Sequence, residues 1–253
     1  MKMTKIAALL SAVLILPGCV IHVGAQSADV ELQENLSIAS SGVKTLEVES
    51  GAGFLNIVGV EGATEITVKA DIETTKKRNY ELELTKVGSR AVLVAKHGST
   101  SGFWNGSSPS INLTVQVPKH LALDIDDGSG DISITDINNF VEVEDGSGSL
   151  FIKNIQGDLI VDDGSGELEI SNVSGNVDID DGSGEMTVTD IAGSVKVEDG
   201  SGEMTLRHIG GMVTIDDGSG SIEVKDAGGL TITDSGSGGL NIKDVKGEFN
   251  IDS

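Results

Sequence analysis

The residues best suited to chemistry in this sequence are aspartates that recur at a constant interval beside glycine and serine. The tetrapeptide Asp-Gly-Ser-Gly occurs six times at a spacing of eighteen residues, and its aspartates are Asp127, Asp145, Asp163, Asp181, Asp199 and Asp217. An acidic residue precedes each of them, which makes a second column of Asp126, Glu144, Asp162, Asp180, Glu198 and Asp216, continued by Asp234. Carboxylate and carbonyl oxygens are the ligands that Ca²⁺ takes in proteins, so the tetrapeptide aspartates are the candidate metal ligands.

Two interpretations of these columns stay open. Carboxylates on adjacent strands, about 4.8 Å apart, repel each other by roughly 1 kcal/mol in water, and bound Ca²⁺ would relieve that repulsion. The phrase is similar to the glycine-rich Ca²⁺ nonapeptide of secreted β-rolls, although Asp precedes the glycine pair here and follows it there. Alternatively, one column caps its own turns by accepting hydrogen bonds from the amides just ahead of it, while the other is solvated. We therefore expect no cofactor, with Ca²⁺ as the alternative.

The sequence does not present a catalytic constellation. The four histidines are scattered without the spacing of metal ligands: His22, His97, His120 and His208. No Ser-His-Asp or Cys-His arrangement can be argued, and the outward strand positions are chemically mixed. We expect a protein that is not an enzyme. A polysaccharide lyase or hydrolase is a weaker alternative, because some parallel β-helices carry those activities.

The fixed period indicates the elements that must position the aspartates. Repetition at this interval is typical of a solenoid. Each unit holds two segments in which aliphatic and polar residues alternate, for example residues 167–170 and 177–179, and alternation by two predicts strands. The predicted fold is all-β: a single-stranded parallel β-helix with two short strands and two glycine-rich corners per coil. One unit departs from the pattern, because Thr231 and Thr233 occupy aliphatic columns, and a one-residue slip would turn Leu230 and Ile232 inward instead.

The N-terminus predicts an envelope location. Residues 1–19 hold two lysines and then an apolar run that ends at Cys19, the only cysteine of the chain. The run is too short to cross a bilayer as a mature helix. The segment resembles a bacterial lipoprotein signal, which implies cleavage before Cys19 and lipid attachment there. An ordinary secretory signal is the alternative. Val20 follows the cysteine, and by resemblance to Gram-negative lipoproteins this favours the outer membrane, facing the periplasm or the cell surface.

The predicted organisation has four parts. Residues 1–18 are the signal peptide, 19–40 a tether, 41–120 an irregular β-rich part and 121–253 the regular array. We expect residues 41–120 to be a wider sheet that extends the same stack, with a separate sandwich as the alternative. Residues 97–109 hold the adjacent aromatics Phe103 and Trp104, which are candidates for contact with a ligand or, alternatively, fold back over the core.

The charge composition of the chain limits the classes of molecule that it can bind. The chain has 40 acidic and 17 basic residues and a formal net charge of −23. A chain without a basic patch cannot neutralise phosphates, so nucleic acid is excluded as a partner. The expected partners are the membrane, through lipid on Cys19, and an envelope protein or glycan.

Three sequence features together carry a family resemblance. They are the early Leu-x-Val segment at residues 46–53, the strand 111–118 that ends in Val-Pro, and the Asp-Gly-Ser-Gly array. The sequence resembles a bacterial family of domains of unknown function that has been labelled adhesin-like. The resemblance covers roughly residues 40–253 and implies a β-solenoid at the cell envelope acting as a binding or structural module. It implies no catalytic residues.

Overall fold

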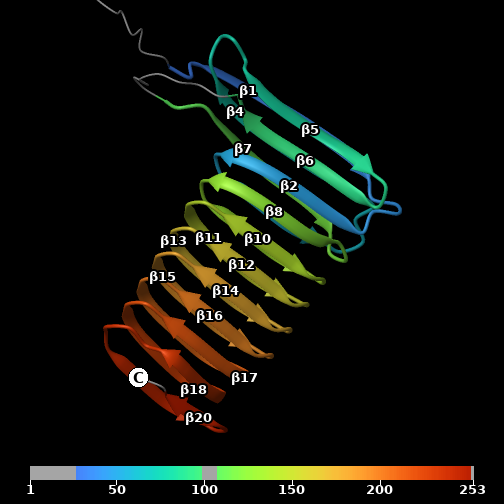
Figure 1. Cartoon of the computed structure of the whole chain (residues 1–253). Helices are drawn as coiled ribbons and strands as arrows, with labels where there is room; N and C mark the ends of the chain where they lie inside the picture. The colour runs from blue at the N-terminus through green and yellow to red at the C-terminus, as the bar shows by residue number, and fades with distance from the viewer. Residues whose placement is uncertain (1–26, 99–106, 252–253) are drawn as a thin grey trace, which may run out of the picture.

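The computed structural model describes residues 27–98 and 107–251, and every regular element in these ranges is a β-strand. The strands stack into a two-faced solenoid (Figure 1). Along the stack, one face contains β5 (Tyr80–Val87), β6 (Arg90–His97), β2 (Thr45–Ala52), β8 (Ala122–Ser129), β10 (Val141–Asp145), β12 (Leu159–Asp163), β14 (Val177–Asp181) and β16 (Val195–Asp199). The other contains β1 (Val30–Ala39), β4 (Glu65–Thr74), β7 (Ser110–Pro118), β3 (Leu55–Val60), β9 (Ile132–Ile137), β11 (Gly148–Ile155), β13 (Gly166–Val173) and β15 (Gly184–Ile191).

The last coils follow the same plan. Strands β17 (Gly202–Asp217) and β18 (Gly220–Asp234) each run along one face, bend at a corner and continue on the other. Strands β19 (Leu240–Val245) and β20 (Phe249–Ile251) pair with the two halves of β18. The predicted parallel β-solenoid is therefore confirmed.

Aliphatic side chains fill the interior in continuous rows. Ile170 lies over Val188 in the parallel register of β13 and β15, and both side chains are fully buried. Most inward strand positions are apolar, and they recur at every second residue because alternate residues point to opposite faces of a strand. Stacking of neighbouring coils buries these rows, since one coil cannot bury its apolar face alone.

The predicted slip in register is also confirmed. The pairing of β17 with β18 shifts so that Val213 lies beside Leu230 and Ile215 beside Ile232, and both β18 residues are fully buried. The slip keeps two aliphatic side chains in the core and leaves Thr231 and Thr233 outside it.

The N-terminal half continues the stack with a different pairing. β2 pairs in parallel with both β6 and β8, so the sheet runs without a break from this half into the regular array. Beyond it, β1, β4 and β7 pair antiparallel, as do β5 and β6 (Figure 1). The tether predicted for residues 19–40 needs correction, because Val30–Ala39 is a full strand that pairs with β4 along its whole length.

Candidate functional site

The structure brings the six tetrapeptide aspartates into one row. Parallel pairing places Asp145 between Asp127 and Asp163, and the same register continues through β14, β16 and β17. The row lies inside the molecule, where each member is at most 7% exposed. In five coils one carboxylate oxygen, Oδ1, accepts a hydrogen bond of 3.0–3.2 Å from the amide of the serine two residues later. The turn-capping role is therefore correct for this column.

Burial changes the acidity of the row. Loss of hydration disfavours the charged carboxylate, and this is the largest cause of a raised pKa at all six positions. Repulsion from the neighbouring aspartates adds to burial and raises the pKa of Asp145 and of Asp181 to about 6. These two residues are two coils apart, on either side of Asp163.

The second acidic column differs from the first in being exposed to solvent. Asp162 and Asp180 point outward and are exposed, as are their counterparts in the neighbouring coils. The two columns thus lie on opposite faces of the same strands and do not converge on a common point. Within the described residues, no group of three or more His, Cys, Asp or Glu side chains is arranged to hold a metal ion. Calcium at the tetrapeptide aspartates remains a prediction, without support from this arrangement.

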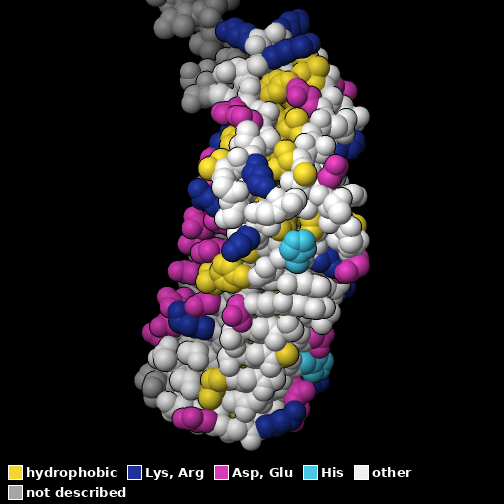
Figure 2. All heavy atoms as spheres, turned by 90° about the vertical axis from the view of Figure 1, so that its right-hand side faces the viewer, with side chains coloured by type: hydrophobic (Ala, Val, Ile, Leu, Met, Phe, Trp, Pro, Cys, Tyr) yellow, Lys and Arg dark blue, Asp and Glu magenta, His cyan; other side chains and the backbone are white. Residues whose placement is uncertain are grey.

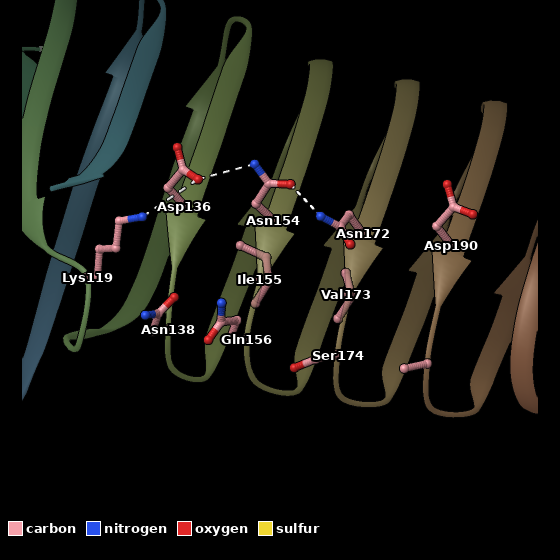
Figure 3. A pocket seen from close by; sticks show the side chains of 11 residues that line it. Lys119, Asp136, Asn138, Asn154, Ile155, Gln156, Asn172, Val173, Ser174 and Asp190 are labelled. Atoms are coloured by element: carbon pink, nitrogen blue, oxygen red, sulfur yellow. Dashed lines mark hydrogen bonds and ion pairs between the residues drawn. The ribbon is translucent and has the colours of Figure 1, made fainter. Parts of the chain in front are cut away.

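A polar groove runs along the opposite corner of the solenoid. It has a volume of about 450 Å³ and crosses successive coils. Figure 3 shows the side chains of Asp136, Asn154, Asn172 and Asp190 on consecutive coils, at equivalent positions. The Nδ2 group of Asn154 donates to Oδ1 of Asp136 at 3.2 Å, and that of Asn172 donates to Oδ1 of Asn154 at 2.6 Å. Nζ of Lys119 lies 3.9 Å from Oδ1 of Asp136 at one end of the groove.

Backbone conformation explains which residues form this ladder. Asp136, Asn154, Asn172 and Asp190 all have positive φ angles, from 58° to 64°. Among residues with a side chain, Asn and Asp enter this left-handed region most readily because their short polar groups bond locally. The turn therefore selects Asn and Asp, and the coil spacing then aligns them. His208 is the next member, and its Nδ1 lies 3.0 Å from Oδ1 of Asp190.

The groove presents neutral hydrogen-bonding groups together with charges at its ends. Gln156, Asn138 and Ser174 lie below the ladder, and Ile155 and Val173 supply apolar surface between them (Figure 3). In the space-filling view, acidic side chains gather along one side, whereas the middle is largely uncharged (Figure 2). Such a surface can bind an extended molecule that carries many hydroxyl or amide groups.

Sequence reasoning missed this ladder, although a signal was present. An Asn, Asp or His recurs at the eighteen-residue interval, directly before the turn and its aliphatic residue, at positions 136, 154, 172, 190, 208, 226 and 244. Their residue type predicts a left-handed turn position. His208, the one histidine of this column, is exposed.

Three predicted site residues lie outside the described residues, namely Cys19, Phe103 and Trp104. Lipid attachment at the first and ligand contact at the other two remain predictions. In residues 27–98 and 107–251, no helix is long and apolar enough to cross a membrane.

Solved structures with similarity to this chain include two proteins named for adhesion. A protein named "putative adhesin" from Bacteroides fragilis has a TM-score of 0.51 at 12% identity, covering 90% of this chain and all of that one. A "putative cell adhesion protein" from Clostridium sporogenes has a TM-score of 0.37 at 15% identity, covering 88% of this chain and 99% of that one. At such identities the first similarity supports the fold alone, and the second carries no argument.

Sequence similarity identifies a family for this chain. No curated protein sequence matches this chain. Residues 65–253 match a protein family described as Toastrack DUF4097, which accounts for most of the chain.

Proposed function

The chain belongs to the Toastrack DUF4097 family, and from that premise we propose that it is a binding module of the bacterial cell envelope without catalytic activity. The sequence prediction of lipid on Cys19 supplies the anchor, at the outer membrane. The solenoid supplies a rigid body, because every coil is hydrogen-bonded to the next along both faces. The name of the similar Bacteroides fragilis structure refers to adhesion, which agrees with a binding role.

The observation that carries the proposal is the corner groove with its Asn and Asp ladder. Its donors and acceptors recur once per coil and line a continuous groove of about 450 Å³. A ligand that repeats its own polar groups along an extended chain could contact several coils in the same way. Envelope glycans have this chemistry. They carry many hydroxyl groups, which can both donate and accept hydrogen bonds.

The experiment compares binding of the full chain and its variants to isolated envelope polysaccharide. The informative substitution is Asn172→Asp. The column already holds Asp at four coils with nearly the same φ, so the turn is preserved. The change replaces an amide donor by an acceptor, and losing one hydrogen bond to the ligand should weaken binding about 3- to 10-fold.

The matched control is Asn241→Asp, which makes the same chemical change in β19, outside the residues that line the groove. Its Nδ2 group donates to Oε2 of the half-buried Glu223 at 3.2 Å. Polysaccharide affinity should be unchanged in this variant. Equal loss of affinity in both variants, or none in Asn172→Asp, would rule out the groove as the binding site.

A further inference from the structure

The aspartate row occupies a place that the fold otherwise reserves for aliphatic side chains. In β12, the residues Leu159, Val161 and Asp163 alternate with exposed neighbours and are each about 1% exposed. The carboxyl group of Asp163 therefore points to the same inner side as the two aliphatic side chains. The register of the coils repeats this arrangement from β8 to β17. The row is thus an interior column of carboxyl groups one strand spacing apart.

Most carboxyl groups of this column have a buried oxygen without a hydrogen-bond partner. Among the described residues, the Oδ2 atoms of five row members are buried without a partner: Asp127, Asp145, Asp163, Asp181 and Asp217. The column continues one coil further at Ser50, which pairs with Asp127 and is buried too. Its Oγ is likewise buried without a partner. A buried acceptor without a donor is costly, so a run of them in one column points to a missing donor.

The charges that act on the row all have the same sign. Repulsion from neighbouring row members raises the pKa of Asp145, Asp181 and Asp199. At Asp127, Asp163 and Asp217 the repulsion comes from outward carboxylates, namely Asp126, Asp162, Asp216 and Asp234. No lysine, arginine or histidine contributes at any of the six positions. The core face opposite the row is aliphatic, with Leu150, Leu168 and Met186 among its members. Within the described residues, the protein therefore offers the row no counter-charge, and its donors are the turn amides on Oδ1 and, at the end of the row, the Ser50 hydroxyl beside Asp127.

We infer that the row is a proton-binding site, in which neighbouring carboxyl groups share protons along the stack in mildly acidic solution. Each bound proton comes from the solvent, removes one negative charge and turns an Oδ2 atom into a donor. That O–H group donates to the Oδ2 atom of the next coil. One bound proton thus satisfies two buried oxygens and relieves the repulsion between their coils.

The direction in which stability changes with pH follows from the raised pKa of the row. The pKa of Asp145 and of Asp181 is raised from 3.8 to about 6 in the folded protein. The folded state therefore holds more protons than the unfolded chain between these values. The stability contributed by the row is fully present below about pH 4 and is lost as the pH rises through about 6. Ordinary salt-bridged aspartates behave in the opposite way.

The test is Asp181→Asn in the full chain, with thermal melts at about pH 4.5 and about pH 7.5. Asparagine keeps an Oδ1 acceptor for the amide of Ser183, which Asp181 now caps at 3.0 Å. Its amide also supplies the donor that the row lacks, independently of pH. The variant should raise Tm by roughly 2–4 °C at the higher pH, and the gain should shrink or vanish at the lower pH.

The matched control is Asp180→Asn, which removes the same charge one residue away on the outer face. Asp180 also repels Asp181, but less than burial, Asp163 and Asp199 do, so this variant should raise Tm at the higher pH by much less than Asp181→Asn. Burial lowers the pKa of His97, so its contribution to stability falls as the pH falls. Both variants keep His97, so this contribution to the pH dependence of Tm cancels when the two are compared.

Two further measurements keep the inference falsifiable if Asp181→Asn fails to fold. In the wild-type chain, the infrared C=O band of protonated carboxyl groups should persist at about pH 5.5, above the usual range for Asp. Absence of that band, or an equal loss of Tm at both pH values in Asp181→Asn, would overturn the inference. A rise in wild-type Tm on adding Ca²⁺, abolished by Asp181→Asn, would assign the row to a metal cation instead.

Discussion

Substitution of Gly148 by alanine tests how closely successive coils approach at the aspartate corner. Gly148 has a φ of +146°, and a Cβ atom added there would lie 1.8 Å from the carbonyl oxygen of Gly130 in the preceding coil. The carbonyl carbon of Gly130 would be only 2.5 Å away. Both atoms belong to the backbone and cannot rotate aside. The substitution can be accommodated only if the two coils separate at this corner.

The magnitude follows from two contributions. A residue with a side chain held at this φ costs about 1–3 kcal/mol. Separating these two coils weakens the bonds from the Gly130 amide to the Ser147 carbonyl, 2.9 Å, and from the Gly146 amide to the Asp127 carbonyl, 3.0 Å. Each such bond contributes about 0.5–1.5 kcal/mol. We expect Gly148→Ala to lower the free energy of unfolding by roughly 2–6 kcal/mol.

The assay is urea unfolding followed by circular dichroism, with Gly62→Ala as the control. Gly62 also has a positive φ, +68°, but no atom lies within 4 Å of the place a Cβ would take. The control carries only the backbone cost, roughly 1–2 kcal/mol. In a solenoid each coil is stabilised by its neighbours, so the Gly148 variant should also unfold over a broader urea range. If both variants shift the midpoint equally, the coils do not approach this closely and the argument fails.

Two further predictions concern the core and the anchor. Ile170→Ala leaves a cavity in a fully buried row and should lower the free energy of unfolding by about 2–5 kcal/mol. Glu169→Ala, on the outer face of the same strand, should change it by less than about 0.5 kcal/mol. Equal effects of the two variants in urea unfolding would contradict the inward position of Ile170. Cys19→Ser should abolish incorporation of labelled fatty acid and release the protein from the membrane fraction, because acyl chains supply the membrane affinity. Retention of the label would refute lipid attachment at this residue.

The sequence by itself determined the repeating part of this protein. A constant eighteen-residue interval, with aliphatic residues two apart in each half, specifies parallel coils and names the inward residues, such as Ile170 and Val188. The same alternation even located the slip at Leu230, since only a one-residue shift keeps an aliphatic side chain inside. These features are local or strictly periodic, so they can be recognised without knowing which distant segments meet.

Only the tertiary structure decided the features that depend on distant pairing. Strand β1 pairs with β4 across 26 to 44 positions of sequence, and no local pattern distinguishes such a strand from a tether. The groove exists because the turns at Asn154 and Asn172 are stacked in register, which gives an exposed turn residue a neighbour of its own kind. The acidity of the row is likewise collective. A single Asp163 in a turn would be an ordinary cap, and it is the burial of six in one column that removes their water and sets them against each other.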